Sequence, residues 1–219
     1  MRIKKVLCLS VICSFIALCF AEDVTITYVM NSGREFQKVV SSESTSLILN
    51  LPKMHVQEIK GLELLPHVKN LEIYTQEIDN LDFIPQFKEL ETVFISQIKL
   101  DSLDYFKDLT KLKELTLDNG VTEDFSDKIN KREEIDFSNL KDLRNITIKD
   151  ENITCVPNIK VCDNQVTLNI ANTGIEDLSQ SDVDTLKPFY MVVLNHSFVR
   201  EYPKTLQWLR NENIGYDAR

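Results

Sequence analysis

The sequence predicts an α/β solenoid in which short parallel strands stack into one sheet. Apolar residues recur with a 22-residue period, and each period contains an apolar pair spaced two residues apart. A single period has too few apolar residues to bury its own edge, whereas stacked periods share one continuous core. Only five glycines occur in 219 residues, and all are isolated. This excludes the glycine-rich loops that bind phosphates and dinucleotides.

The period is clearest between Val68 and Leu109. Apolar residues at Leu71, Ile73, Ile78, Leu81, Ile84 and Phe87 return 22 positions later at Val93, Ile95, Leu100, Leu103, Phe106 and Leu109. Extending the register predicts about seven repeats over residues 46–202. They begin near Ser46, Val68, Leu90, Leu112, Leu143, Gln165 and Phe189. In this register the first inward pair is Leu49 and Leu51, and the fourth repeat, 112–142, is irregular and longer than the others.

The spacing changes within each repeat. The pair spaced two apart is typical of a short strand with alternate side chains facing inward. The apolar residues that follow are mostly three apart, which favours a 3-10 or irregular return over an α-helix. Pro85 lies inside one such return, where it would break an α-helix. We therefore expect strands on one side and a thin, mostly non-α-helical return on the other.

This pattern resembles the leucine-rich repeat, and its period resembles the secreted bacterial type that includes the internalins. The resemblance implies a right-handed solenoid with its parallel sheet on the concave face and protein binding as its function. The sequence departs from the family where an asparagine or cysteine normally bonds neighbouring coils. That position holds Met54, Gln76, Ile98, Gly120, Glu151, Thr173 and Ser197. The asparagine ladder is therefore degenerate, and we expect a less regular solenoid.

Both ends of the repeat region carry sequences suited to caps. Over residues 22–45, alternating apolar residues precede the turn sequence Asn31-Ser32-Gly33, which predicts a β-hairpin. Residues 203–219 predict a short helix and an extended piece that close the last repeat. Inside the long fourth repeat, the charged segment 123–134 predicts a surface excursion. It is either a tolerated loop insertion or a binding loop.

Residues 1–21 have the layout of a secretory signal peptide. Basic residues precede an apolar stretch that ends at Ala21 and is shorter than the roughly 20 residues of a membrane-spanning helix. We therefore expect a secreted, periplasmic or cell-surface protein. Cleavage after Ala21 and lipid attachment at Cys19 remain alternatives. Cys155 and Cys162 lie outside the leader, and an oxidising compartment predicts a disulfide between them.

The composition also excludes several functions. A formal net charge of -9 opposes nucleic-acid binding, which depends on lysine and arginine releasing counterions. No G-x-S-x-G or H-E-x-x-H motif occurs, and the three histidines have no ligand spacing. The acidic pairs Glu133–Glu134 and Asp182–Asp184 lack any sign of a shielded cleft. We expect no catalytic activity, no metal and no cofactor.

Function is then expected on the outward strand positions of the concave face. The candidate partner-binding residues are Ile48, Glu72, Tyr74, Phe94, Ser96, Thr116, Asp118, Thr147, Lys149, Asn169, Met191 and Val193. Tyr74 and Phe94 stand out because exposed aromatic residues commonly anchor protein interfaces. A protein partner is predicted. The alternatives are a carbohydrate stacked on Tyr74 and Phe94, or a structural envelope component without a specific ligand.

Three N-x-S/T sequons add a possible modification, at Asn145, Asn152 and Asn195. They would carry glycans only in a eukaryotic secretory pathway.

Overall fold

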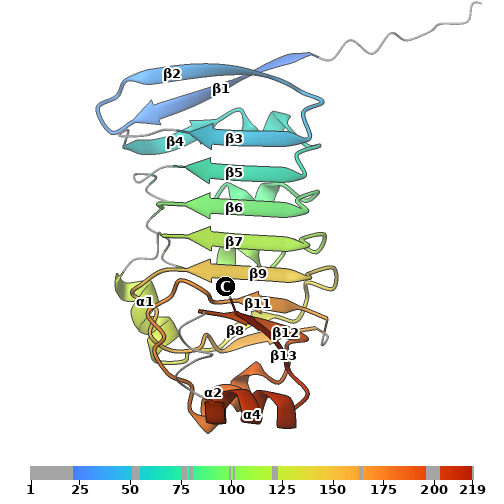
Figure 1. Ribbon diagram of the computed structural model, residues 1–219. Helices are drawn as coiled ribbons and strands as arrows, with labels where there is room; N and C mark the ends of the chain where they lie inside the picture. The colour runs from blue at the N-terminus through green and yellow to red at the C-terminus, as the bar shows by residue number, and fades with distance from the viewer. Residues whose placement is uncertain are drawn as a thin grey trace, which may run out of the picture.

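The computed structural model describes residues 22–50, 55–74, 78, 81–98, 100, 102–119, 123–162, 165–195 and 203–218. Within these residues, eight parallel strands form the main sheet, in the order β13-β12-β11-β9-β7-β6-β5-β3 (Figure 1). The strands are β3 (Ser46–Asn50), β5 (Asn70–Tyr74), β6 (Thr92–Ser96), β7 (Glu114–Asp118), β9 (Asn145–Lys149), β11 (Thr167–Asn169), β12 (Met191–Leu194) and β13 (Gly215–Ala218). Neighbours in the sheet follow the order of the chain. Each coil therefore adds one strand beside the preceding one, as the repeat predicts.

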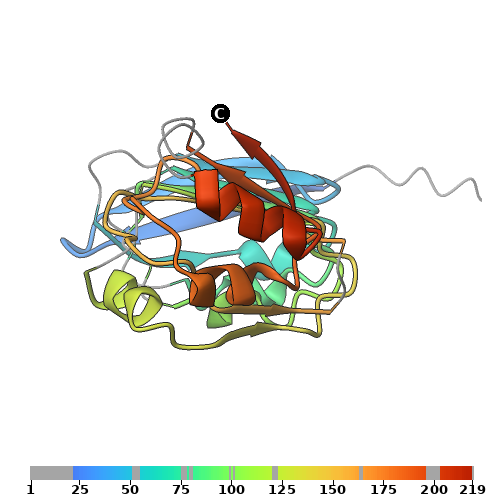
Figure 2. The ribbon, with the colours of Figure 1, turned by 60° about the horizontal axis from the view of Figure 1, so that its bottom comes forward.

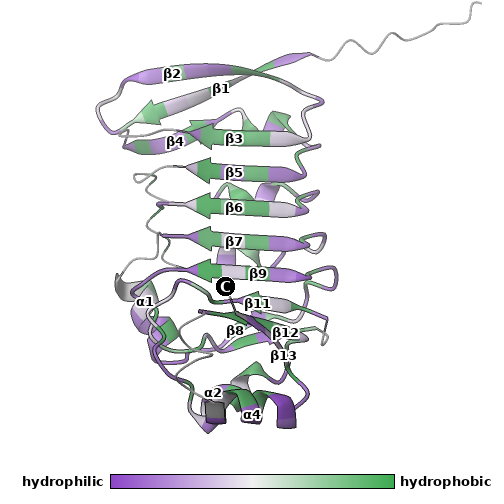
Figure 3. Cartoon of the chain, viewed as in Figure 1, coloured by the Kyte–Doolittle hydropathy of each residue, from purple (hydrophilic) through white to green (hydrophobic). Residues whose placement is uncertain are grey.

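The strand register explains why the repeat carries apolar pairs. Leu71 lies opposite Val93, which lies opposite Leu115, and the next inward residue in this line is Ile146. All four side chains are at most 1% exposed. Leu115 and Ile146 are 31 residues apart, nine more than the 22-residue period. The inward residues of successive coils belong to one hydrophobic cluster, and the strands of the main sheet carry apolar colour in Figure 3.

The first coil departs from the predicted register. Leu47 lies opposite Leu71 and Leu49 opposite Ile73, so the first inward pair is Leu47 and Leu49. The predicted pair of Leu49 and Leu51 was wrong by two positions. Side chains two apart on a strand share a face, so the alternating leucines in this segment fit either register. Leu51 itself lies outside the described residues.

The returns run behind the sheet and are mostly 3-10 or irregular, as predicted (Figure 2). Three of them contain the 3-10 helices η1 (Leu62–Leu64), η2 (Ile84–Gln86) and η3 (Asp104–Phe106). Pro85 occupies the first turn of η2, where its missing N–H leaves no bond unmade. Later returns contain strands β8 (Ile135–Phe137) and β10 (Ile159–Val161), which pair in parallel, and helix α2 (Gln180–Leu186).

The charged segment of the fourth repeat forms helix α1 (Glu123–Asn130). Phe125 and Ile129 are 3% and 1% exposed and join the core. At the end of the helix, the Asn130 Oδ1 accepts hydrogen bonds from the N–H groups of Thr154 and Cys155, at 2.9 and 3.2 Å. The segment is therefore a helix whose apolar side is built into the core of the solenoid.

The corners after several strands turn without glycine. Gln97, Asn119 and Asn172 have φ angles of 61°, 50° and 64°. Asparagine tolerates this left-handed conformation better than most residues. Asn119 N–H also donates to the carbonyl oxygen of Lys149 on the next coil, at 2.7 Å. These corners account for the low glycine count.

The described residues at the positions where the family carries the asparagine ladder do not make the bonds between coils that the ladder would make. Ile98 is buried, Glu151 is exposed, and the Thr173 Oγ1 donates to the Ile170 carbonyl within its own coil, at 2.8 Å. The remaining ladder positions (Met54, Gln76, Gly120 and Ser197) lie outside the described residues.

Additional elements lie at both ends of the main sheet. Strands β1 (Asp23–Met30) and β2 (Glu35–Ser41) make the N-terminal hairpin, and β4 (Val56–Lys60) adds to β1 as a further antiparallel strand. At the other end, helix α4 (Pro203–Asn211) leads to β13, which pairs with β12. No helix among the described residues is long and apolar enough to cross a membrane. The predicted signal peptide, including Cys19, lies outside the described residues.

The predicted disulfide is absent. Cys155 and Cys162 are both free thiols, one half-buried and the other exposed. Strand β10 lies between them and keeps this part of the chain extended.

Candidate functional site

The solvent face of the main sheet carries the candidate residues in aligned rows. The register places seven outward side chains in one row: Ile48, Glu72, Phe94, Thr116, Thr147, Asn169 and Val193. A second row holds Tyr74, Ser96, Asp118 and Lys149. Met191 lies beside Thr167 at the start of β12. Every outward residue predicted from the repeat therefore comes from this sheet.

Four of these residues form the aromatic patch, defined here as Ile48, Glu72, Tyr74 and Phe94. The ring centroids of Tyr74 and Phe94 lie 5.2 Å apart, with the ring planes inclined by 38°. Tyr74 is 37% exposed and Ile48 is 44% exposed, while Phe94 is half-buried. Tilted aromatic pairs at this separation attract each other beyond the gain from burial alone. The rings therefore support one another and still leave apolar surface open.

Glu72 holds the Tyr74 hydroxyl in place. The two residues are spaced two apart on β5 and therefore share a face. The Tyr74 hydroxyl donates a hydrogen bond of 2.9 Å to the Glu72 Oε2. This bond to a carboxylate raises the pKa of Tyr74 above its usual value, with smaller contributions from desolvation and charge repulsion. The patch thus combines two rings with an anchored acidic group.

The N-terminal hairpin borders the patch and leaves it open. The Lys38 Nζ, on β2, donates to the carbonyl oxygen of Ile48 at 2.7 Å. This satisfies an acceptor on the edge strand β3 without covering the Ile48 side chain. Ile48 therefore contributes exposed apolar surface.

Asp118 and Lys149 face each other across β7 and β9. Their charged groups lie 4.0 Å apart, and each side chain is about 30% exposed. An exposed pair of this kind contributes at most about 1 kcal/mol to stability. Ser96 lies between Tyr74 and Asp118 in the same row.

Beyond Phe94 the sheet surface is hollowed, forming what we term the polar hollow. Its volume is about 300 Å³. It is lined by Glu114, Thr116, Asn145, Ile146, Thr147, Thr167, Asn169, Met191 and Val193. Five of the predicted residues therefore meet here. The sequence analysis did not predict this depression, and the row of short threonine and asparagine side chains that follows Phe94 is the feature of the sequence that accompanies it.

The apolar pair predicted at the far end of the sheet is not an exposed patch. Val193 is only 4% exposed and Met191 is half-buried. Treating Val193 as exposed binding surface was wrong, because outward direction on a strand does not guarantee exposure near the end of a solenoid. Both residues instead form an apolar side of the polar hollow.

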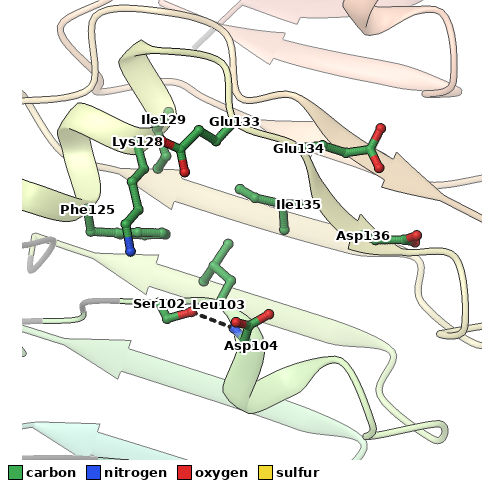
Figure 4. A pocket seen from close by; sticks show the side chains of 10 residues that line it. All are labelled: Ser102, Leu103, Asp104, Phe125, Lys128, Ile129, Glu133, Glu134, Ile135 and Asp136. Atoms are coloured by element: carbon green, nitrogen blue, oxygen red, sulfur yellow. Dashed lines mark hydrogen bonds between the residues drawn. The ribbon is translucent and has the colours of Figure 1, made fainter.

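A second hollow, of about 150 Å³, lies behind the sheet between η3, α1 and β8 (Figure 4). Its rim carries four carboxylates: Asp104, Glu133, Glu134 and Asp136. Figure 4 shows Glu134 and Asp136 on one side and Lys128 with Phe125 on the other. Within the described ranges, no three histidine, cysteine or acidic side chains gather as a metal site.

Asp136 is held by its own neighbours. It accepts hydrogen bonds from the Ser138 N–H at 2.8 Å and from the Lys160 Nζ at 3.1 Å. Hydrogen bonds from Ser138 and then Lys160 lower the pKa of Asp136 to about 2. The residue therefore stays ionised and links β8 to β10, a structural role.

The acidic pair Asp182–Asp184 is also accounted for by structure. Asp182 accepts from the Ser179 N–H at 2.7 Å and forms an ion pair with Arg132, capping α2. Asp184 pairs with Lys187 at 2.7 Å. Neither carboxylate is placed to act on a substrate together with the other.

The three sequons lie in different settings. The Asn145 Nδ2 donates to the Glu114 Oε1 at 3.3 Å inside the polar hollow. The Asn195 Oδ1 accepts from the Asn172 N–H at 2.6 Å, so this side chain supports a corner. Asn152 lies in an exposed turn bonded to Asp150.

Comparison with known proteins finds similarity among solved structures. No protein-family model matches the chain, and no curated protein matches it. The crystal structure of an internalin from Listeria monocytogenes aligns with 72% of this chain at 18% sequence identity, with a TM-score of 0.40. The alignment covers 51% of the internalin, so this chain spans about half of that structure.

Proposed function

We propose that this chain is an exported leucine-rich-repeat protein that binds a protein partner through the aromatic patch. The observation that carries the proposal is the exposed contact between Tyr74 and Phe94 on neighbouring strands of the sheet. The 22-residue repeat supports the family assignment, and the leader sequence supports export.

The patch has the properties of a preorganised anchor. Its side chains stand on strands fixed by backbone pairing, and Tyr74 is further oriented by Glu72. Aromatic residues held in this way bind with little loss of conformational entropy. Because the acidic Glu72 lies within the patch and the chain is acidic overall, we infer an apolar partner surface bordered by basic residues.

The same geometry disfavours a carbohydrate stacked on Tyr74 and Phe94. Stacking on both rings needs a common flat platform, whereas the ring planes here are inclined by 38°. A structural envelope role would instead require the chain to associate with itself. Its sedimentation behaviour distinguishes this alternative, because a partner-binding module is expected to remain monomeric at micromolar concentration.

The test compares the double variant Tyr74→Ala/Phe94→Ala with Thr92→Ala. Thr92 lies on the same face of β6, outside the patch, and serves as the matched control. Each protein is immobilised, and proteins enriched from the surface fraction of the source organism are quantified by mass spectrometry. A partner retained by the control and lost by the double variant supports the proposal. Equal retention by the double variant and the control overturns it, provided their melting temperatures agree.

A further inference from the structure

We infer that the polar hollow is a separate binding site for a neutral saccharide residue. It spans β7, β9, β11 and β12, whereas the aromatic patch lies on β3, β5 and β6. The two sites share the solvent face but no residue. The saccharide inference therefore does not depend on the protein partner proposed above.

The hollow offers unused hydrogen-bonding groups of both kinds. In the part of the chain that the structure describes, the hydroxyls of Thr116, Thr147 and Thr167 bond to no other protein group. Each hydroxyl can donate and accept, as each sugar hydroxyl can. Because strands are spaced about 4.8 Å apart, hydroxyls on neighbouring strands lie at about the width of a pyranose ring.

Two asparagines add one hydrogen-bond acceptor and one hydrogen-bond donor, and each side chain is held in place by a bond to the protein. The Asn145 Nδ2 is engaged by Glu114, which leaves its Oδ1 as an acceptor. The Asn169 Oδ1 accepts from the Ala171 N–H at 3.1 Å, which leaves its Nδ2 as a donor. With the Glu114 carboxylate, the hollow presents hydroxyls, an amide donor and several acceptors. A hydroxyl-rich ligand matches this set.

The remaining lining explains why the ligand is expected to be a neutral sugar. Glu114 is the only charged residue among those that line the hollow in the described chain, so an anionic ligand meets no cation there. Met191 and Val193 supply an apolar side against which the C–H face of a sugar ring can pack. Sulfated or sialylated sugars are disfavoured by Glu114 and by the acidic chain.

The experiment titrates ¹⁵N-labelled protein with neutral disaccharides and tetrasaccharides of glucose, galactose, mannose and N-acetylglucosamine. Production in bacteria keeps Asn145 free of a eukaryotic glycan. Millimolar affinity is expected for at least one sugar, with shifts in the side-chain amides of Asn145 and Asn169. Sulfated and sialylated counterparts serve as ligands expected not to bind. No shift with any neutral sugar at about 10 mM overturns the inference.

The double variant Thr116→Val/Thr147→Val removes two hydroxyls and keeps the β-branched shape that suits a strand. It should weaken binding about 30-fold, since two hydrogen bonds of roughly 1 kcal/mol each are lost and every 1.4 kcal/mol is a factor of ten. Thr92→Val, on the same face outside the hollow, should bind as the unmodified protein does. A second variant, Thr167→Phe, fills the hollow and should abolish binding, with the dispersion of backbone amide signals reporting the fold.

The aromatic-patch variant separates this site from the protein-binding proposal. Tyr74→Ala/Phe94→Ala should bind the sugar unchanged. Loss of sugar binding in that variant, with retention in Thr116→Val/Thr147→Val, overturns the assignment to the hollow. A further measurement uses a peptide that carries the sugar found to bind, and compares its affinity with that of the free sugar. Tighter binding of the glycopeptide than of the free sugar identifies a glycoprotein as the source, and equal binding identifies a free saccharide.

Discussion

The Tyr74 and Phe94 rings lie on neighbouring strands with their centroids 5.2 Å apart and their planes inclined by 38°. The residues are not directly opposite, because Phe94 lies opposite Glu72 and Tyr74 opposite Ser96. Their contact is diagonal, a separation that only long side chains bridge. The contact therefore depends on both rings.

This contact should be measurable as a coupling energy. In a double-mutant cycle with Tyr74→Ala and Phe94→Ala, we expect the two losses in unfolding free energy to be coupled by about 0.5–1 kcal/mol. Urea denaturation of the four proteins provides the measurement. Strictly additive losses would show that the rings do not stabilise one another.

The hydrogen bond from Tyr74 to Glu72 predicts late ionisation of this phenol. Because the bond to the carboxylate raises the pKa of Tyr74 above 10.0, the bond is intact at neutral pH. Its contribution to stability is present below pH 10 and is lost as the pH rises through the raised pKa. The ionisation is followed by the absorbance at about 295 nm as the pH is raised. The difference between the titration of the unmodified protein and that of Tyr74→Phe gives the contribution of this one tyrosine among the six in the chain.

Replacing Glu72 by alanine provides the control for that titration. Without the carboxylate, the midpoint assigned to Tyr74 should fall towards that of an ordinary tyrosine. An unchanged midpoint in Glu72→Ala would contradict the assigned cause.

Helix α1 should behave as part of the core. Ile129 is 1% exposed, so Ile129→Ala should lower the unfolding free energy by about 2–4 kcal/mol through lost burial and a cavity. Asp127 is exposed on the same helix. Asp127→Ala should therefore change the unfolding free energy by less than about 0.5 kcal/mol. Chemical denaturation compares the two variants. Similar small effects would support the interpretation of this segment as a tolerated insertion.

The two cysteines should remain reactive in protein purified without reductant. Cys162 is exposed and should react rapidly with a thiol reagent in the native state, whereas the half-buried Cys155 should react more slowly. Cys162→Ser should remove the fast phase, and Cys155→Ser should preserve it. Failure of both cysteines to react even after denaturation would instead demonstrate the disulfide predicted from the sequence.

Much of the architecture could be predicted because an inward-facing ladder imposes a repeating pattern. The spacing from Leu71 to Val93 specified the sheet, and the lengthening before Ile146 located the irregular coil. The register of β3 could not be predicted, because Leu47, Leu49 and Leu51 alternate alike and only pairing with β5 selects between registers. The outward residues of the candidate site could be placed on one face, but their exposure could not. Val193 shows the difference, since it points outward and is buried.

The sequence by itself determined that successive coils stack and which side of each strand faces the core, since burial enforces both through local periodicity. Only the tertiary structure decided that Tyr74 and Phe94 touch, that short side chains on four strands leave a hollow, and that Cys155 and Cys162 are free thiols. Those relationships join residues from different coils or depend on the path of the chain between them. No periodic pattern specifies them, because the outward positions are free of the constraint that repeats the inward ones.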